Sequence, residues 1–274
     1  MIDLHLHTTA SDGRSTPDGL VDEAAAAGIR TLAVTDHDTL AAVPAVFAAA
    51  QAAGLDAIAG VEVTAVHAGR DVHVLGYYVD VADAALGDFL AAQRLDRRRR
   101  VFEIAERLEQ LGAPIDTTAF EAEAAVGGRA LGRPRVAAAL IAAGHARDIA
   151  DAFERYLGVG RPAFVERRGA SPAEVVRRLQ AAGAIAALAH PGKMANDEII
   201  DPMIDAGMPA IEVFHPDHDE ADTARYAHLA RARGLIMTGG SDYHGPGSPR
   251  AWAFGRIGLP ADAFSALRAR GRPA

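Results

Sequence analysis

Histidine and acidic residues that could bind metal ions recur along this 274-residue chain, beginning close to its first residue. In residues 2–7 the apolar side chains alternate with Asp3, His5 and His7, which predicts a short strand with both imidazoles on one face. Two imidazoles spaced in this way can bind one ion. Because the chain contains no cysteine, a metal site must use imidazole and carboxylate ligands, a set that favours Mn, Fe, Zn or Mg.

Most other candidate ligands share one feature, a position at or just beyond the end of an apolar segment of strand length. Such segments cover residues 31–35, 57–63, 72–78, 184–189, 210–214 and 235–238. The side chains at their ends are those of His37, Glu62, His73, His190, His215, Asp242 and His244. In a parallel barrel the carboxyl ends of the strands share one face, where active sites lie, so we expect these side chains to converge.

Several acidic residues near these histidines have other interpretations. Asp12 lies in a Ser-Asp-Gly turn and, taken alone, is better explained as a turn residue. Asp36 is expected to support a ligand, and Asp38 to cap the N-terminus of a helix. Glu62 ends an apolar strand, where bridging two metal ions would offset the cost of burying its charge. Three histidines without such positions are expected to be surface or structural residues: His67, His145 and His228.

Helices separate most of the expected strands. Thr16-Pro17 predicts the start of an Ala-rich helix that ends at Gly28, and Ser171 opens a capping box that begins another. About seven strands alternating with helices predict an α/β fold with a parallel sheet that closes, or nearly closes, into a barrel.

Residues from about 95 to 165 break this alternation. Helices are expected over residues 97–111 and 134–143, with Gly127-Gly128 between them. We therefore expect a barrel of residues 1–95 and 166–274, with residues 96–165 as a small helical insertion covering one mouth. Ordinary decoration of a barrel loop explains the segment equally well. The run Arg97–Arg100 is expected to be solvated.

Composition excludes some classes of partner. A net charge of -8 and a pI near 5.7 argue against long duplex nucleic acid, although a few arginines could still hold a short nucleotide. No apolar run reaches membrane-spanning length, and the first candidate ligand follows Met1 too closely for a removable leader. These features predict a cytoplasmic protein that does not bind membranes.

Seven segments together resemble the PHP family, which is named for polymerase and histidinol phosphatase: DLHLHTTASDG, VTDHDT, GVEVT, HVLGYY, ALAHPGK, IEVFHPDH and TGGSDYHG. The resemblance covers nearly the whole chain and implies a distorted, TIM-like (β/α)7 barrel that holds two or three divalent metal ions. By motif, it implies a first site of His5, His7, Glu62 and Asp242. It further implies a second site of Glu62, His73 and His190, and a third of Asp12, His37 and His244.

Three further segments, GRP at 132–134, YLGVGRPAFV and FHPDH, resemble the branch of this family that acts on nucleoside 3′,5′-bisphosphates and short 5′-phosphorylated oligonucleotides. Arg133 and Arg135 are then candidates for binding a phosphate that is not cleaved, because arginine suits bidentate phosphate contacts. A solvated helix face explains both residues equally well. Arg135 stands where the resemblance leads us to expect histidine.

The resemblance also implies a mechanism, in which a hydroxide bridging two metal ions attacks phosphorus. His215 belongs to none of the three ligand sets, so we expect it to protonate the departing oxygen or orient the phosphate. Two alternatives are a histidinol-phosphate phosphatase and a non-catalytic PHP module. All nine ligand positions carry a competent side chain, which argues against the module.

Overall fold

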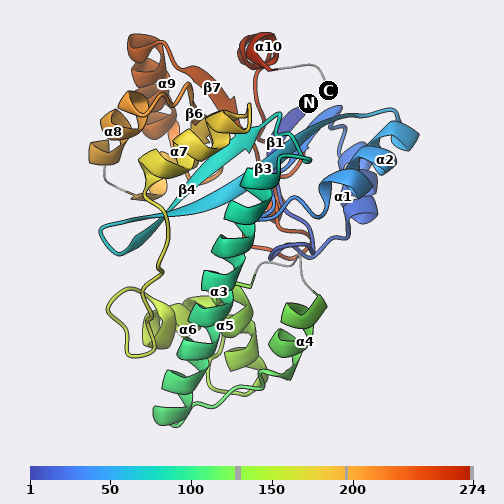
Figure 1. Cartoon of the computed structure of the whole chain (residues 1–274). Coiled ribbons are helices and arrows are strands. Elements are labelled where there is room, and N and C mark those ends of the chain that lie inside the picture. Colours follow the sequence, from blue (N-terminus) through green and yellow to red (C-terminus); the bar gives the residue numbers. More distant parts are fainter. Residues whose placement is uncertain (127–130, 195–196, 272–274) are drawn as a thin grey trace.

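A computed structural model describes residues 1–126, 131–194 and 197–271, so the glycine pair at 127–128 lies outside the described residues. Seven strands form one sheet in sequence order: β1 (Ile2–Leu6), β2 (Thr31–Val34), β3 (Asp56–His67), β4 (Arg70–Tyr77), β5 (Ile185–Leu188), β6 (Ala210–Phe214) and β7 (Ile236–Gly239). The backbone N–H of His7 donates to the carbonyl of Tyr243, and that of Ser241 to the carboxylate of Asp3, each at 2.9 Å. These bonds join the first strand to the segment after the last, and the sheet nearly closes into the predicted barrel (Figure 1).

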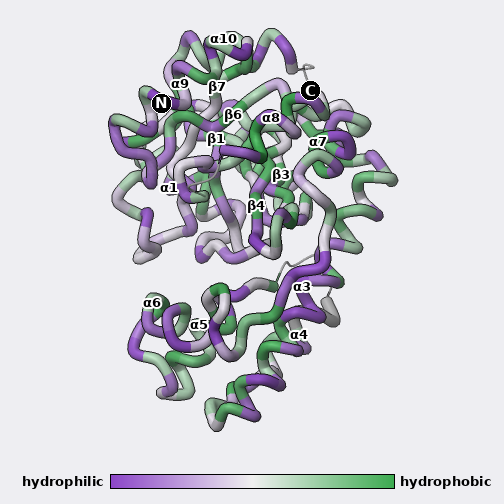
Figure 2. The backbone as a smooth tube through the Cα atoms, turned by 90° about the vertical axis from the view of Figure 1, so that its left-hand side faces the viewer, coloured by the Kyte–Doolittle hydropathy of each residue, from purple (hydrophilic) through white to green (hydrophobic). Residues whose placement is uncertain are grey.

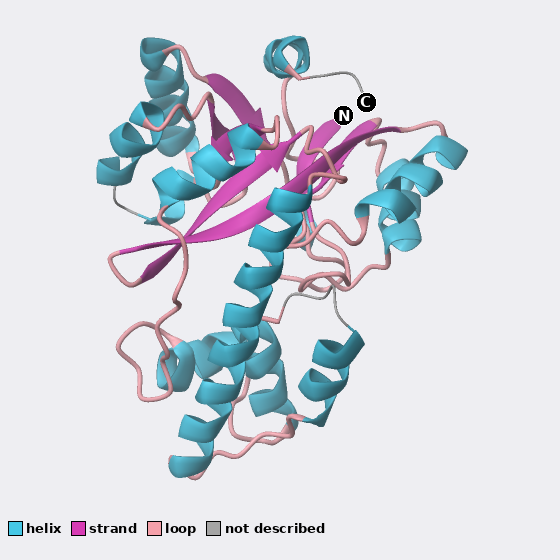
Figure 3. Ribbon diagram, in the orientation of Figure 1, coloured by secondary structure: helices cyan, strands magenta, loops and turns pink. Residues whose placement is uncertain are grey.

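One strand runs against the others, so the prediction of a wholly parallel sheet is wrong. Strand β4 pairs antiparallel with both β3 and β5. No helix separates β3 from β4, and Ala68 and Gly69, both with positive φ, reverse the chain in a tight hairpin (Figure 3). A hairpin of this length can connect only antiparallel strands.

The hairpin changes how two candidate ligands reach the site. Strand β3 continues to His67, so Glu62 lies in its middle rather than at its end. His73 lies near the beginning of β4, opposite Thr64 of β3. Because β4 is reversed, its amino-terminal half lies beside the carboxyl-terminal half of β3. The expectation that His73 follows the carboxyl end of a strand is therefore wrong, although it reaches the same face.

Helices cover the outside of the sheet (Figure 1): α1 (Pro17–Ala26), α2 (Val43–Ala53), α7 (Pro172–Ala181), α8 (Ile200–Asp205), α9 (Glu220–Arg233) and α10 (Ala261–Arg270). Short 3-10 turns occur at η2 (Pro191–Met194), η3 (Asp197–Ile199) and η4 (Ala251–Ala253). The predicted helix starts are confirmed, because the side chains of Thr16 and Ser171 cap α1 and α7. Among the described residues, no helix is long and apolar enough to cross a membrane.

A second group of helices lies below the barrel in Figure 1: α3 (Ala84–Gln110), α4 (Thr118–Val126), α5 (Arg133–Ala142), α6 (Ile149–Ala152) and the π-helical turn η1 (Phe153–Leu157). This helical lobe has its own apolar core, which includes Ile104, Leu108, Val136 and Leu140. Figure 2 shows the lobe beneath the barrel from a second direction. Helix α3 begins at Ala84 and runs unbroken past residue 96, so one helix belongs to both parts. That residues 96–165 form a separate insertion domain stays a prediction.

Candidate metal centre

Glu62 lies at the centre of the predicted ligands and is almost fully buried. Its Oε2 is 3.3 Å from Nε2 of both His5 and His7 and 3.1 Å from Nδ1 of His37. Its Oε1 is 2.8 Å from Nδ1 of His73 and 3.1 Å from Nε2 of His190. Two ligand atoms about 2.1 Å from one ion at a tetrahedral angle are about 3.4 Å apart. The spacing around both carboxylate oxygens therefore suits shared cations.

Asp242 approaches the same two imidazoles from the segment after β7. Its Oδ1 lies 3.5 Å from Nε2 of His5 and 3.3 Å from Nε2 of His7. This approach depends on Gly240, because a Cβ there would overlap the backbone nitrogen of His5. The structure thus brings together His5, His7, Glu62 and Asp242, the residues that the resemblance implies for one site.

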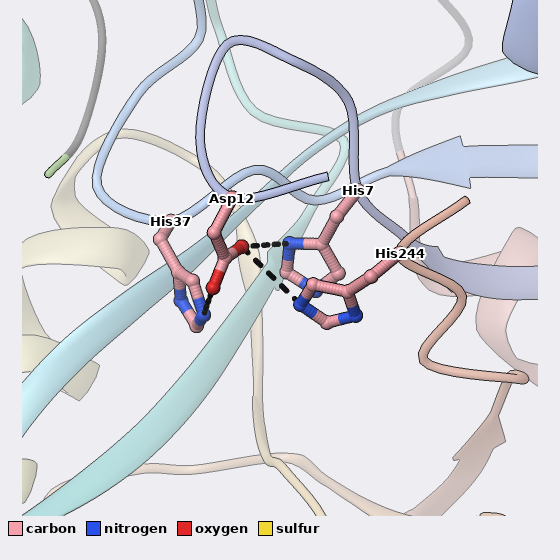
Figure 4. A group of neighbouring side chains, drawn as sticks. All are labelled: His7, Asp12, His37 and His244. Carbon is pink, nitrogen blue, oxygen red and sulfur yellow. Dashed lines mark ion pairs between the residues drawn. The ribbon is translucent and has the colours of Figure 1, made fainter. Parts of the chain in front are cut away.

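Asp12 lies among the side chains of a further group, shown in Figure 4. Its Oδ1 is 3.2 Å from Nε2 of His244 and 3.9 Å from Nδ1 of His7, and its Oδ2 is 3.8 Å from Nε2 of His37. These four residues place one potential ligand atom each within 4.8 Å of one another. Asp12 is therefore more than a turn residue, since it points into the histidine cluster.

The loop that carries Asp12 is held by Asp36. One carboxylate oxygen of Asp36 accepts from the hydroxyl of Thr8 and the other from that of Ser11, both at 2.6 Å. Asp36 also accepts the backbone N–H of Thr8 at 2.8 Å. Asp36 therefore supports the site through this loop, in line with its expected role as a residue that supports a ligand.

The residues present fit divalent cations. Nε2 of His5 and His7 and Nδ1 of His37 and His73 are buried and make no hydrogen bond within the described part of the chain. Buried polar atoms in proteins are normally paired, so unpaired nitrogens facing carboxylates leave lone pairs for an ion. The donors are imidazole nitrogens and carboxylate oxygens, which suit Mn, Fe or Zn.

The charges of the cluster lead to the same interpretation. Burial opposes ionisation of Glu62, but the surrounding imidazoles hold its pKa well below the usual range. Burial lowers the pKa of His37 to about 3, so this imidazole is neutral and able to coordinate. For His7, the nearby carboxylates of Asp242 and Glu62 outweigh burial and raise the pKa to about 10. Without a cation, the ionised carboxylates therefore keep a proton on the His7 imidazole, and a bound cation would displace it.

Glu212 belongs to this centre and was missed in the sequence. Its Oε1 lies 2.9 Å from Nδ1 of His5, and its Oε2 accepts the backbone N–H of His190 at 2.7 Å. The side chain is fully buried. A carboxylate behind a ligand histidine fixes the ring and its tautomer. An acidic residue inside the apolar strand IEVF is the same signal that marked Glu62, and it could have identified Glu212.

A cavity of about 640 Å³ adjoins the cluster. Asp12, His37, His73 and His190 line it. Six basic residues line it as well, most of them from the helical lobe and neighbouring loops: Arg70, Arg97, Arg100, Arg133, Arg167 and Lys193. Its volume is typical of a small-molecule site. His67, expected to be a surface residue, is exposed and also borders this cavity.

The expectation that Arg97 and Arg100 are solvated is wrong. They are three positions apart on α3, so they share the face that packs on the barrel and are 8% and 5% exposed. Nη2 of Arg97 donates to the hydroxyl of Thr64 at 2.6 Å, and Nη1 of Arg100 lies 2.9 Å from Asp71.

Asp38 also differs from its expected role as a helix cap. The N-cap of α2 is Ala42, because α2 begins at Val43. Oδ2 of Asp38 instead accepts from Nε of Arg97 at 2.5 Å and from Nη2 of Arg167 at 2.8 Å. Asp38 therefore holds two buried arginines at the wall of the cavity.

The three residues expected to contact substrate have different surroundings. Nη2 of Arg133 lies 2.8 Å from Oδ2 of Asp71, and the side chain lines the cavity. Arg135 is half-buried on the same helix and is not among the residues that border the cavity. Nδ1 of His215 accepts the backbone N–H of Asp217 at 3.0 Å, and its Nε2 lies 3.3 Å from Oδ2 of Asp242. His215 is therefore beside a candidate ligand, with Nε2 facing the cluster.

The chain is similar to known phosphoesterases. A family model described as PHP domain matches residues 3–126. The chain is 36% identical over 252 residues to the 5′-3′ exoribonuclease Rnm of Salmonella typhimurium, covering 89% of this chain and 85% of that protein. It is 33% identical over 257 residues to the 3′,5′-nucleoside bisphosphate phosphatase of Chromobacterium violaceum, covering 90% and 88%.

Two further relatives match this chain over most of their own length. The chain is 34% identical over 269 residues to the phosphoribosyl 1,2-cyclic phosphate 1,2-diphosphodiesterase of Eggerthella lenta, covering 93% of this chain and 95% of that protein. The crystal structure of a protein from Bifidobacterium adolescentis, designated a metal-dependent phosphoesterase, matches with a TM-score of 0.90 and 32% identity. That match covers 99% of this chain and 96% of the other.

Proposed function

Because this chain belongs to the PHP family of metal-dependent phosphoesterases, we propose that it removes the 3′-phosphate of nucleoside 3′,5′-bisphosphates. Adenosine 3′,5′-bisphosphate would be one such substrate, and short 5′-phosphorylated oligonucleotides would be others. The observation that carries this proposal is one cavity lined by candidate metal ligands and by buried arginines. A substrate with two phosphates has a partner for each. The names of the exoribonuclease and bisphosphate phosphatase relatives support the same substrate class.

The metal ligands of the proposed enzyme follow the groups described above. His5, His7, Glu62 and Asp242 would hold one divalent ion, and Glu62 would share a second with His73 and His190. A third ion would bind to Asp12, His37 and His244. Bound ions would lower the pKa of water and neutralise charge on the reacting phosphoryl oxygens. Glu212, through His5 and the backbone of His190, keeps two of the ligands in place.

Four arginines at the wall of the cavity would bind the phosphate that is not cleaved; together, Arg97, Arg100, Arg133 and Arg167 form the arginine wall. Asp71 is paired with both Arg100 and Arg133, and Asp38 with both Arg97 and Arg167. Each carboxylate therefore neutralises only one of its two guanidinium groups. The resulting excess of positive charge suits a phosphate dianion. Arg133 is the proposed contact to the 5′-phosphate, with Arg135 as a weaker candidate because it does not border the cavity.

His215 is proposed to act on the leaving group. Its Nδ1 is occupied as an acceptor, so in the neutral ring the proton is on Nε2, which faces Asp242. From that atom a proton could pass to the departing 3′-oxygen. A role in orienting the phosphate needs the same N–H group.

Two other activities are distinguishable by assay. The relative from Eggerthella lenta favours phosphoribosyl 1,2-cyclic phosphate as a second candidate substrate. Histidinol phosphate is a third, but with one phosphate it leaves the arginine wall without a ligand. We expect kcat/KM to be highest for adenosine 3′,5′-bisphosphate when the three compounds are assayed side by side with Mn²⁺. A higher value for either of the others would replace the proposed substrate.

A further inference from the structure

His218 is a buried histidine that belongs to none of the candidate ligand groups. Its Nδ1 lies 2.8 Å from the carbonyl oxygen of Val213. Its Nε2 accepts the backbone N–H of Gly192 at 3.1 Å. A carbonyl can only accept and an amide N–H can only donate, so these two partners fix one neutral tautomer with the proton on Nδ1.

The segment that His218 contacts carries two residues of the candidate site. Gly192 lies in the turn η2, between the candidate ligand His190 and the cavity-lining Lys193. The backbone of His190 has a φ of 30°, a value that residues other than glycine rarely adopt. Such a backbone conformation persists only where its surroundings hold it in place.

The segment 212–218 holds this strained turn through two hydrogen bonds. Glu212 accepts the backbone N–H of His190 at 2.7 Å, and His218 accepts that of Gly192. The ring of His218 is itself packed, with its centroid 5.2 Å from that of Tyr226 and 5.4 Å from that of His215. A Cβ added to Gly192 would lie only 2.7 Å from Cδ2 of His218, so the turn rests directly on the ring.

We propose that His218 is a positioning residue, which sets the turn after β5 so that His190 faces Glu62 and Lys193 faces the cavity. Loss of its hydrogen bond to Gly192 releases the strained backbone of His190 and weakens the metal site to which His190 contributes. The effect on metal binding follows from the geometry of the candidate ligand His190 alone. The effect on substrate, through Lys193, depends on the proposed function.

The test compares His218→Phe with His218→Gln. Phenylalanine keeps the ring volume but loses both hydrogen bonds, whereas the side-chain amide of glutamine can accept from Gly192 and donate to Val213. We expect His218→Phe to lower Mn²⁺ affinity about 10- to 100-fold, the usual effect of removing a partner that supports a ligand. His218→Gln should restore most of that affinity. His228→Phe, at an exposed position on α9, is the matched control and should bind Mn²⁺ like the wild type.

Calorimetric titration with Mn²⁺ measures the affinity without a substrate, and thermal unfolding checks that each variant is folded. Wild-type Mn²⁺ affinity in a folded His218→Phe variant would overturn the proposal, as would equal losses in the Phe and Gln variants. If His218→Phe does not fold, Gly192→Ala displaces the same turn from the other side and should show the same loss. Gly192→Ala with unchanged affinity would then overturn it. A chain that passes this test but does not hydrolyse bisphosphates refutes only the proposed function.

Discussion

Oε1 of Glu212 lies 2.9 Å from Nδ1 of His5, and both side chains are completely buried. The contact turns the opposite ring nitrogen, Nε2, toward Glu62 and Asp242. One acidic residue of β6 thereby fixes the orientation of a histidine of β1, although 207 positions separate them in the sequence. This relationship links the barrel geometry to the metal centre.

Glu212→Gln should lower metal affinity, because the amide cannot balance charge on the imidazole as a carboxylate does. A loss of about 10- to 100-fold is expected for a supporting partner of this kind. Calorimetric titration with Mn²⁺ measures it directly. Glu109→Gln, an exposed change of the same type on α3, is the control. Equal affinities of the Glu212 and Glu109 variants would show that the contact with His5 does not support metal binding.

Asp12→Ala should separate the third metal position from the other two. Asp12 contacts His244 and His37 but is not among the residues around Oε1 of Glu62. The variant should therefore retain a bound pair of ions while losing much of its activity. Elemental analysis of the purified variant counts the ions per chain. Loss of all bound metal would indicate that the positions assemble as one unit.

Asp38→Ala should destabilise the fold far more than removal of a helix cap. It leaves Arg97 and Arg167 buried without their shared carboxylate, a change that typically costs about 3 to 5 kcal/mol. Asp83→Ala removes the true N-cap of α3 and should cost about 1 kcal/mol. Denaturant unfolding of both variants in the presence of a chelator compares the two values. Similar losses in free energy of unfolding would refute the structural role of Asp38.

The contact of Asp38 with Arg97 and Arg167 also makes the free energy of unfolding depend on pH. Burial opposes ionisation of Asp38, but Arg97 and Arg167 outweigh it and hold its pKa well below the usual range. A carboxylate with a lowered folded-state pKa stabilises the protein fully above its unfolded pKa of about 3.9. That contribution is lost only as the pH falls through the lower folded value. The difference between wild type and Asp38→Ala should therefore persist from neutral pH down to about pH 4.

Local patterns in the sequence predicted much of the barrel and of the site. Alternation in β1 placed His5 and His7 on one face, and the caps at Thr16 and Ser171 marked helix starts. The reversal of β4 could not be read from its own residues, because strand direction depends on the hairpin that precedes it. Arg97 and Arg100 lie in a run of four arginines, and composition alone does not show which face of α3 packs on the barrel.

Arg133→Ala should impair only substrates that carry a second phosphate. A charge-assisted contact to phosphate is worth about 1.5 to 3 kcal/mol, so kcat/KM for adenosine 3′,5′-bisphosphate should fall about ten- to a hundredfold. Adenosine 3′-monophosphate lacks the 5′ group and should be barely affected. Steady-state kinetics of both substrates with wild type and variant measure the difference. Equal losses on both would mean that Arg133 serves the reacting phosphate or the fold, and no loss on either would remove it from the site.

The position of the phosphate that leaves adenosine 3′,5′-bisphosphate tests the central claim most directly. Purified protein supplied with Mn²⁺ should release inorganic phosphate and form adenosine 5′-monophosphate, identified by chromatography against both monophosphate standards. Treatment with a chelator should abolish the reaction, and added Mn²⁺ should restore it, because the candidate ligands surround positions for cations. Formation of adenosine 3′-monophosphate, or undiminished turnover in metal-stripped protein, would contradict the account.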